Sequence, residues 1–305
     1  MSFESIYLGY VISIFQVTKD IKLRAIIGGI VSLIPFVYSL WDKIRPMGDD
    51  RSSEYGRNVW RARINDVKTT GIDLSLDVVV ELGPGRNLAA SIAALLDGAQ
   101  IAIGVDVVKY ANTKENQKIF DELVGNGNNN GHVKVNKSLI REALCFAGDP
   151  AKETILKYKV PWSDPSIISA ASVDFIFSLS VMEHIREPDR VYAACFAWLR
   201  PGGVMCHKID HSSHGITRTW NGHYWIPDWL WCLIMGKRPY LINRWTPDQH
   251  KAFAESAGFE VFSMHCISDD SEKADIYKYE PNIKYRSSPI PGLFVKTSIM
   301  VARKP

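Results

Sequence analysis

Asp77–Arg86 (DVVVELGPGR) is the stretch that decides the fold, because a short β-branched run ends there in two closely spaced glycines. The run Asp77–Leu82 is apolar, which is typical of a strand buried on both faces of a parallel sheet. Gly83 and Gly85 allow the backbone to turn sharply and to approach a ligand without an intervening side chain. The next run, Asn87–Leu96, is predicted to be a helix whose first amide groups can hold a carboxylate.

Strands and helices alternate along the rest of the chain. Further strands are predicted from apolar runs at 101–107, 155–160, 173–179, 204–209, 259–265 and 294–302. Further helices are predicted at 54–70, 113–124, 188–199 and from a cap at Thr246 to Gly258. This alternation predicts an α/β fold: a doubly wound, seven-stranded, mostly parallel sheet with helices on both faces.

A carboxylate at the end of the second predicted strand points to a nucleoside ligand. Asp106 occupies this position, where an acid in a doubly wound fold accepts hydrogen bonds from ribose hydroxyls. The fingerprint for dinucleotides would require a third glycine at the position of Leu88. This chain also has Glu81 before the glycines and Pro84 between them, so a dinucleotide is not the predicted ligand.

Three motifs in register resemble those of a known superfamily. ELGPGR (81–86) resembles the first motif of class I S-adenosylmethionine-dependent methyltransferases. DFIFSLSVMEHI (174–185) and LRPGGV (199–204) resemble later motifs of the same superfamily, in the same order. The resemblance runs from about Glu54 to the C-terminus, and it implies a Rossmann-like fold, methyltransferase activity and S-adenosylmethionine as cofactor.

The resemblance also implies which residues contact the cofactor. Those expected around its methionine part lie near the end of the first strand or in the turn after it: Glu81, Gly83, Pro84 and Gly85. Those expected around its ribose and adenine end the second and third strands: Asp106, Val107 and the adenine-wall candidates Pro161 and Trp162. Those expected beside the sulfonium and the reacting methyl end the fourth strand: Ser178, Leu179 and Ser180. The pair Glu183 and His184 is expected to hold the following helix in place.

The segment Cys206–Gly215 (CHKIDHSSHG) contains the candidates for catalysis. It ends the fifth strand, at the edge of the sheet where ligands bind in such folds. Transfer to a hydroxyl needs a base near the departing proton, and Asp210 and His211 are our first choices. His207 is a further candidate, although it falls inside the strand and suits the core equally well. His207, Asp210, His211 and His214 could together also bind a divalent metal or form a solvated loop, but we predict no metal site.

An aromatic insertion at 216–245 contains five of the nine tryptophans. It is expected to cover the substrate, because aromatic faces suit sugar rings or a lipid-like acceptor, or else to form a small core of its own. IDHSSH (209–214), this insertion, Asn243-Arg244 and AGFE (257–260) are together similar to methyltransferases associated with bacterial surface polysaccharide assembly. The sequence differs from that group at 216–221.

These features predict an S-adenosylmethionine-dependent O-methyltransferase that acts on a hydroxyl of a sugar or glycan. One alternative is a C-methyltransferase of a quinone or other lipid-like acceptor, which the motif at 174–185 also resembles. Another alternative is a catalytically silent module that binds the cofactor or a partner. The net charge of +3, without a long basic run, predicts no nucleic-acid partner.

Residues 1–46 form an apolar extension ahead of the methyltransferase domain at 54–305. Its two apolar stretches, 6–17 and 25–41, are too short or too interrupted for an ordinary membrane span. The alternatives are a membrane hairpin or interfacial anchor through 6–41, a helical pair packed on the domain or a second subunit, and a true span. Five scattered cysteines without a CxxC pair predict a reducing compartment, so we expect a cytoplasmic protein. If the extension binds lipid, we expect the protein at the inner face of the membrane.

Overall fold

The computed structural model describes residues 18–34, 52–125, 136–162, 164–238, 240–268 and 290–305. Within these residues a single seven-stranded sheet has the order β3-β2-β1-β4-β5-β7-β6. The strands are β1 (Val78–Leu82), β2 (Ile101–Val105), β3 (Leu156–Lys159), β4 (Val173–Leu179), β5 (Leu199–Asp210), β6 (Glu260–Ser268) and β7 (Val295–Arg303). Strands β1 to β5 pair in parallel, and β7 is antiparallel to both of its neighbours. The predicted fold class is confirmed.

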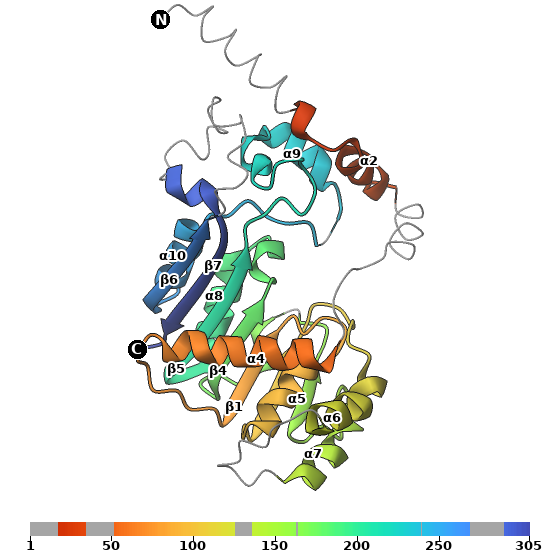
Figure 1. The fold of residues 1–305 in the computed structure, drawn as a ribbon, viewed down its shortest axis with the longest axis vertical. Coiled ribbons are helices and arrows are strands. Elements are labelled where there is room, and N and C mark those ends of the chain that lie inside the picture. The colour runs from red at the N-terminus through yellow and green to blue at the C-terminus, as the bar shows by residue number, and fades with distance from the viewer. Residues whose placement is uncertain (1–17, 35–51, 126–135, 163, 239, 269–289) are drawn as a thin grey trace, which may run out of the picture.

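Helices cover both faces of this sheet, as Figure 1 shows. The α-helices of the described residues are α2 (Leu23–Ser32), α4 (Ser53–Lys68), α5 (Ala89–Leu96), α6 (Asn116–Gly125), α7 (Lys137–Leu144), α8 (Pro188–Trp198), α9 (Asp228–Met235) and α10 (Pro247–Ser256). One core lies between the sheet and the layer of α4, α5, α6 and α7. A second core lies between the sheet and the layer of α8 and α10.

The alternation of side chains along β4 explains how one strand serves both cores. Phe175 and Phe177 point to the first core, where both rings contact Trp60 of α4. Ile176, between them, points to the second core. A strand buried on both faces needs apolar residues at nearly every position, which is the pattern found in β1, β2 and β4.

Local capping sets the ends of several helices. The predicted capping box at the start of α10 is present, with Thr246 and Gln249 exchanging hydrogen bonds and Pro247 in the first turn. Helix α7 was not predicted, although Asn136 caps it by accepting a hydrogen bond from the Leu139 amide. Helix α7 has only eight residues, although Ile140, Ala143 and Leu144 lie at helical spacing on its buried face.

β5 begins earlier than predicted. Arg200–Gly203, which lies between the predicted helix at 188–199 and the predicted strand at 204–209, belongs to β5. The Gly202 amide donates to the Lys304 carbonyl, and the Lys304 amide donates to Gly203, so this turn-like stretch stays bonded to the C-terminal residues. β5 therefore runs from Leu199 to Asp210.

The described part of the N-terminal extension packs against the aromatic insertion. Ile21 and Ala25 share a third apolar core with Trp225 and Trp231 of the insertion. Gly29 of α2 lies so close to the Leu233 carbonyl of α9 that a side chain there would collide with backbone. Among the described residues, no helix is long and apolar enough to cross a membrane. The predicted stretch at 6–17 and all of 35–46 lie outside the described residues.

Candidate functional site

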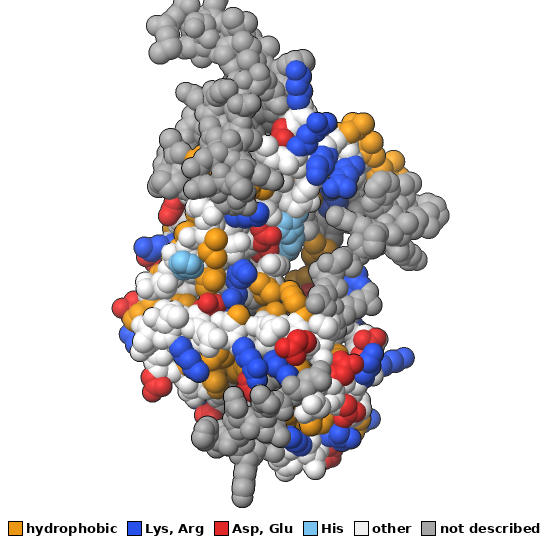
Figure 2. All heavy atoms as spheres, viewed as in Figure 1, with side chains coloured by type: hydrophobic (Ala, Val, Ile, Leu, Met, Phe, Trp, Pro, Cys, Tyr) orange, Lys and Arg blue, Asp and Glu red, His pale blue; other side chains and the backbone are white. Residues whose placement is uncertain are grey.

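A cavity of about 1250 Å³ lies beyond the carboxyl ends of β1, β2 and β4. One end is lined by the turns that follow these strands, and the other by α2, by the residues after β5 and by the aromatic insertion. Figure 2 shows this face of the molecule, with Lys and Arg side chains gathered toward its upper part, around α2. The two ends differ in their chemistry.

The first end is built on the glycine turn after β1. Gly83 has φ 63° and Gly85 has φ 70°, both in the left-handed region that favours glycine. A Cβ on Gly83 would lie 2.6 Å from Cγ2 of Val181, whereas nothing lies within 4 Å of a Cβ on Gly85. The turn therefore packs tightly on one side and leaves open space on the other, where Pro84 and both glycines line the cavity.

Glu81 is a buried carboxylate at this end. Its side chain accepts a hydrogen bond of 2.7 Å from the Ser91 hydroxyl of α5, and the residue is 8% exposed. Burial raises the pKa of Glu81 to about 7, and the nearby Asp106 carboxylate adds to the rise. A carboxylate with this environment is suited to pair with a cationic group of a ligand.

Asp106 follows β2 and lines the cavity together with Val107 and Trp162. Its carboxylate accepts a hydrogen bond of 2.7 Å from the Val107 amide, and burial raises its pKa. The Trp162 amide donates to the Asp106 carbonyl at 2.8 Å, which holds the end of β3 beside the end of β2. Pro161, the weaker adenine-wall candidate, is not among the residues that line the cavity.

The residues at the end of β4 divide between cavity and core. Leu179 and Ser180 line the cavity, and Ser180 has φ 54°, which is unusual for a residue with a side chain. Ser178 does not line it, because its fully buried hydroxyl is bonded to Nδ1 of His207 at 2.8 Å. Strand alternation turns Ser178 into the core, so the expectation that its side chain lies beside the reacting methyl does not fit the structure.

Two of the three predicted catalytic residues are also held in the core. His207 is fully buried, and burial lowers its pKa to about 3. His211 bonds through Nε2 to the Ser298 hydroxyl at 2.8 Å and through Nδ1 to the Trp245 carbonyl at 3.2 Å. Both ring nitrogens of His211 are thus engaged, and neither His207 nor His211 lines the cavity.

Asp210, the third predicted catalytic residue, is hydrogen-bonded to His214, which was not among the predicted catalytic residues. Oδ2 of Asp210 accepts a hydrogen bond of 3.0 Å from Nε2 of His214, and Oδ1 accepts one of 2.8 Å from the Ser212 amide. Burial alone would raise the pKa of Asp210, but these hydrogen bonds hold it well below its usual range. His214 lines the cavity and has φ 45°, so its backbone is strained at the point where the side chain faces the site.

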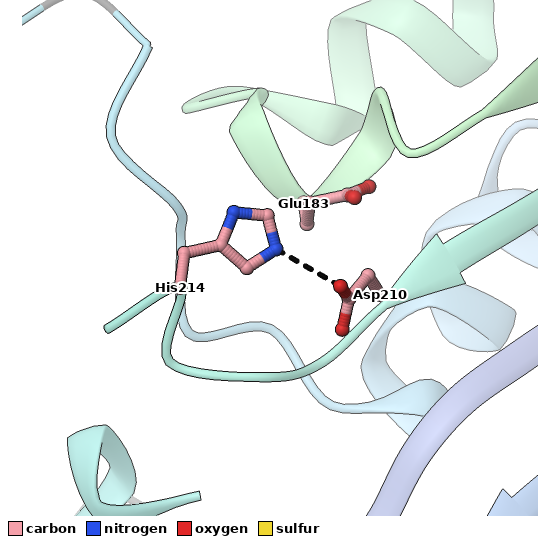
Figure 3. A group of neighbouring side chains, drawn as sticks. All are labelled: Glu183, Asp210 and His214. Atoms are coloured by element: carbon pink, nitrogen blue, oxygen red, sulfur yellow. Dashed lines mark hydrogen bonds and ion pairs between the residues drawn. The ribbon is translucent and has the colours of Figure 1, made fainter. Parts of the chain in front are cut away.

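Glu183 lies beside this pair, as Figure 3 shows. Glu183, Asp210 and His214 each offer one atom capable of binding a metal, and these atoms lie within 4.8 Å of one another. Burial, followed by the charge of Asp210, raises the pKa of Glu183 to about 8. His184 lines the cavity next to His214, with ring centroids 5.3 Å apart, and burial lowers its pKa to about 4. Of the pair expected only to hold a helix, His184 thus lines the cavity, whereas Glu183 is buried beside Asp210 and does not line it.

The second end of the cavity is rich in cations. Arg24 of α2, Arg186 and Arg238 line it, and no carboxylate forms an ion pair with Arg24 or Arg186 among the described residues. Arg186 donates to the Arg238 carbonyl at 2.7 Å, and Arg238 donates to the Ala25 carbonyl of α2 at 3.2 Å. None of the five tryptophans of the insertion lines the cavity, and the small-core alternative describes Trp225 and Trp231, whereas Trp229 is 62% exposed.

Comparisons with known proteins point to one family. Residues 51–264 match a family model described as a methyltransferase domain. No curated protein matches the chain significantly. An S-adenosylmethionine-dependent methyltransferase from Mesorhizobium loti has 13% identity and a TM-score of 0.41, with 80% of this chain and 98% of that chain covered.

Two further solved structures are similar at the same level. A SAM-dependent methyltransferase from Methanosarcina mazei has 12% identity and a TM-score of 0.42, covering 76% of this chain and 94% of its own. Phosphoethanolamine N-methyltransferase 2 from Haemonchus contortus, in complex with S-adenosyl-L-methionine, has 15% identity and a TM-score of 0.43, covering 81% and 53%. At these identities the likeness concerns the fold alone.

Proposed function

Because this chain belongs to the methyltransferase-domain family, we propose that it transfers a methyl group from S-adenosylmethionine to a hydroxyl of a sugar or glycan. Family membership makes it a methyltransferase, with S-adenosylmethionine as the methyl donor. The acceptor and the roles of individual residues are our inference from the cavity.

The observation that carries the choice of acceptor is the group of three arginines at the second end of the cavity, which Ile216, Tyr240, Leu241 and Ile242 also line. Arg24, Arg186 and Arg238 present several N–H donors there, which suit the many oxygen atoms of a sugar. A quinone or other lipid-like acceptor would favour an apolar lining with aromatic rings. Trp225 and Trp231, which could have offered such rings, are used in the core of the insertion.

The first end of the cavity suits S-adenosylmethionine. Glu81 would pair with the amino group of the methionine part, beside the backbone of Gly83, Pro84 and Gly85. Asp106 would accept hydrogen bonds from the ribose diol, and Val107 and Trp162 would border the adenine. This assignment is supported by the burial of Glu81, because a bound ammonium would offset the cost of ionising that carboxylate.

The reaction joins the two ends of the cavity. The acceptor oxygen attacks the methyl carbon, the carbon–sulfur bond breaks with its electron pair going to sulfur, and S-adenosylhomocysteine is released. The hydroxyl proton leaves to water. We propose that Asp210 and His214 activate this hydroxyl, since His214 lines the cavity and donates a hydrogen bond to Asp210, which does not itself line the cavity. His207 and His211 support the site from the core.

We further propose that the enzyme works at the inner face of a membrane, in surface polysaccharide assembly. The face of α2 that turns away from α9 exposes large apolar side chains, with Leu23 at 71% and Ile34, just beyond its end, at 52%. Lys19 and Lys22 lie at the start of this helix. Apolar side chains flanked by basic ones are typical of helices that lie on anionic lipid.

Sedimentation with vesicles tests the membrane proposal. We expect binding to vesicles that contain phosphatidylglycerol, weaker binding to phosphatidylcholine vesicles, and loss of binding in Leu23→Ser with Ile27→Ser. Ile267→Ser, an exposed apolar side chain on β6, is the matched control. Equal recovery of all variants with both kinds of vesicle would contradict this proposal.

Transfer from methyl-deuterated S-adenosylmethionine tests the acceptor. The protein is incubated with glycan and lipid fractions, and the labelled product is identified by mass spectrometry and NMR. We expect a deuterated methyl ether on a sugar oxygen. A label on the carbon of a quinone ring would overturn the proposed acceptor while leaving the methyltransferase assignment intact.

A further inference from the structure

We propose that Glu183, Asp210 and His214 bind one divalent metal cation, which holds and activates the acceptor hydroxyl. The inference rests on the proposed function, because the cation would act on the hydroxyl at the second end of the cavity. It replaces the four groups that the sequence alone suggested as metal ligands, of which the structure retains only Asp210 and His214.

The carboxylate of Glu183 is the first reason. The residue is 2% exposed, and neither of its carboxylate oxygens has a hydrogen bond of ordinary geometry among the described residues. The Ser180 side chain and the backbone of Glu183 and of Asp210 give it only partial hydrogen bonding. A buried carboxylate with such weak donors is costly, and the cost rises when a second carboxylate lies close by. A cation between Glu183 and Asp210 would offset both costs, because it would contact an oxygen of each.

The geometry of the three donor atoms is the second reason. Nε2 of His214 and Oδ2 of Asp210 are 3.0 Å apart, and all three donor atoms lie within 4.8 Å of one another. Ligands on adjacent positions of an octahedral ion with bonds of about 2.1 Å are separated by about 3 Å, and opposite ones by about 4.2 Å. A shift of a few tenths of an ångström in one side chain would therefore close the site.

The segments that carry the two acidic ligands are well held. Glu183 lies in a short 3-10 helix (Met182–His184) soon after β4, and the Asn243 amide group donates to the carbonyl of Met182 in that helix and to the carbonyl of Ile185 just after it. Asp210 is the last residue of β5, which is paired on both sides. Placing ligands on bonded elements favours a defined binding site over a chance cluster of surface acids.

The donor set indicates the kind of metal. Two carboxylate oxygens and one imidazole nitrogen favour Mn²⁺ or Mg²⁺ over thiophilic ions. Three protein ligands leave positions open for water and for the acceptor oxygen, and His214 lines the cavity, so the open side can face the substrate. A cation bound to the hydroxyl would lower its pKa, and the proton would leave to water.

Neighbouring histidines do not complete the set. Both ring nitrogens of His211 are bonded to protein atoms, and Nδ1 of His207 is bonded to Ser178. His184 lies next to His214, but it is not one of the three groups whose donor atoms converge. The remaining coordination is therefore expected from water and the acceptor.

Titration with Mn²⁺ tests the site directly. The full-length protein is stripped with EDTA, dialysed and titrated with MnCl₂, and free Mn²⁺ is measured by electron paramagnetic resonance. We expect one site per chain, displaced by excess Mg²⁺, and at least about tenfold weaker in Glu183→Gln, Asp210→Asn and His214→Gln. Glu255→Gln and His265→Gln, which change exposed groups elsewhere, are the matched controls and should bind as the wild type does.

The result that would overturn the proposal is Mn²⁺ binding of equal strength in the wild type and in all three site variants. Three separate variants keep the test decisive if one of them fails to fold. Affinity for S-adenosylhomocysteine, measured by calorimetry, should be retained in each. The proposed function is tested separately. If the stripped enzyme still forms the methyl ether, the cation proposal is contradicted and O-methylation stands. If the protein binds Mn²⁺ at this site but forms no methyl ether, the cation site stands and the proposed O-methylation is contradicted.

Discussion

The two ends of the cavity are built in different ways. The first end carries two acids, Glu81 within β1 and Asp106 directly after β2, and these two strands are adjacent in the sheet. The second end carries cations and histidines, drawn from segments as far apart as α2 and the aromatic insertion. One end therefore depends on local backbone geometry, and the other depends on how distant parts of the chain dock together.

This difference follows the chemistry expected at each end. A nucleoside with a cationic methionine tail suits a fixed turn with two carboxylates, which the β1–α5 and β2 connections supply. An acceptor is recognised by the lining that surrounds its reacting atom, and that lining comes from loops and from an added helix. Substitutions at the two ends should consequently affect different measurements.

The largest expected effect separates the two ends most clearly. Asp210→Asn removes the charge that holds the His214 ring at 3.0 Å and should lower kcat by about 100-fold or more. The affinity for S-adenosylhomocysteine should stay within about twofold, because Asp210 does not line the first end. Steady-state kinetics and calorimetry measure the two quantities. Asp189→Asn on α8 is the control, and a parallel loss of cofactor affinity in Asp210→Asn would contradict the separation.

Asp106→Ala should act in the opposite way. The variant loses hydrogen bonds to the ribose diol, so the affinity for S-adenosylhomocysteine should fall by roughly 100-fold. At saturating S-adenosylmethionine, kcat should fall much less. If calorimetry gave the same Kd for wild type and Asp106→Ala, the first end would not be the cofactor site.

Sequence patterns predict the first end far better than the second. Gly83, Gly85 and Asp106 were identified because a strand, a turn and an acid leave a signal within a few residues, and all three line the cavity. The seven strands were found for the same reason. Of the Asp210–His214 pair, Asp210 was predicted and His214 was not, because nothing in the local pattern shows which histidine of Cys206–Gly215 faces the cavity.

The error at the second end has an identifiable cause. The predicted strand ended at Ile209, whereas β5 continues to Asp210 and pairs with β7 over its whole C-terminal half. In a strand, alternate residues face the same side, so His207 and His211 both turn toward the core with α8 and α10, where their rings contact Tyr192 and His250. The contribution of α2 had no local signal, because docking of an apolar helix depends on the surface that receives it.

The pH dependence of stability sharpens the description of the first end. Burial raises the pKa of Glu81 from 4.5 to about 7, so the folded protein holds a proton that the unfolded chain releases. The stabilisation from Glu81 is complete below pH 4.5 and is lost as pH rises through about 7. Thermal unfolding without cofactor should show Glu81→Gln near the wild type at pH 5 and more stable than it at pH 8, by about 2 kcal/mol.

The cofactor should reverse this order. A bound ammonium favours the ionised carboxylate, so S-adenosylmethionine should stabilise the wild type at pH 8 more than Glu81→Gln. Ser91→Ala, which removes the hydroxyl donor of Glu81, should raise the pKa further and shift the loss of stability to higher pH. Identical profiles for wild type and Glu81→Gln from pH 5 to 8 would show that Glu81 keeps its ordinary pKa.

Detaching α2 tests whether the second end depends on docking. Gly29→Val places a side chain against the carbonyls of Leu233 and Ile234 in α9, which should cost between about 1 and 2 kcal/mol and loosen α2. The KM for the acceptor should rise while the Kd for S-adenosylhomocysteine stays constant. Ile30→Val, on the exposed side of the same helix, is the control. An unchanged acceptor KM would show that α2 does not form the wall of a binding site.

The smallest expected effect concerns the cations themselves. Arg24→Gln and Arg186→Gln each remove one charged donor from the second end and should raise the acceptor KM by roughly threefold to tenfold, without changing kcat or cofactor affinity. Because both side chains are exposed, the effect should shrink as salt is added. Arg218→Gln removes the same charge from the insertion outside the cavity and should change nothing. If both cavity variants matched Arg218→Gln at low salt, the acceptor would be recognised without these arginines, and the polar contrast between the two ends would have no role in specificity.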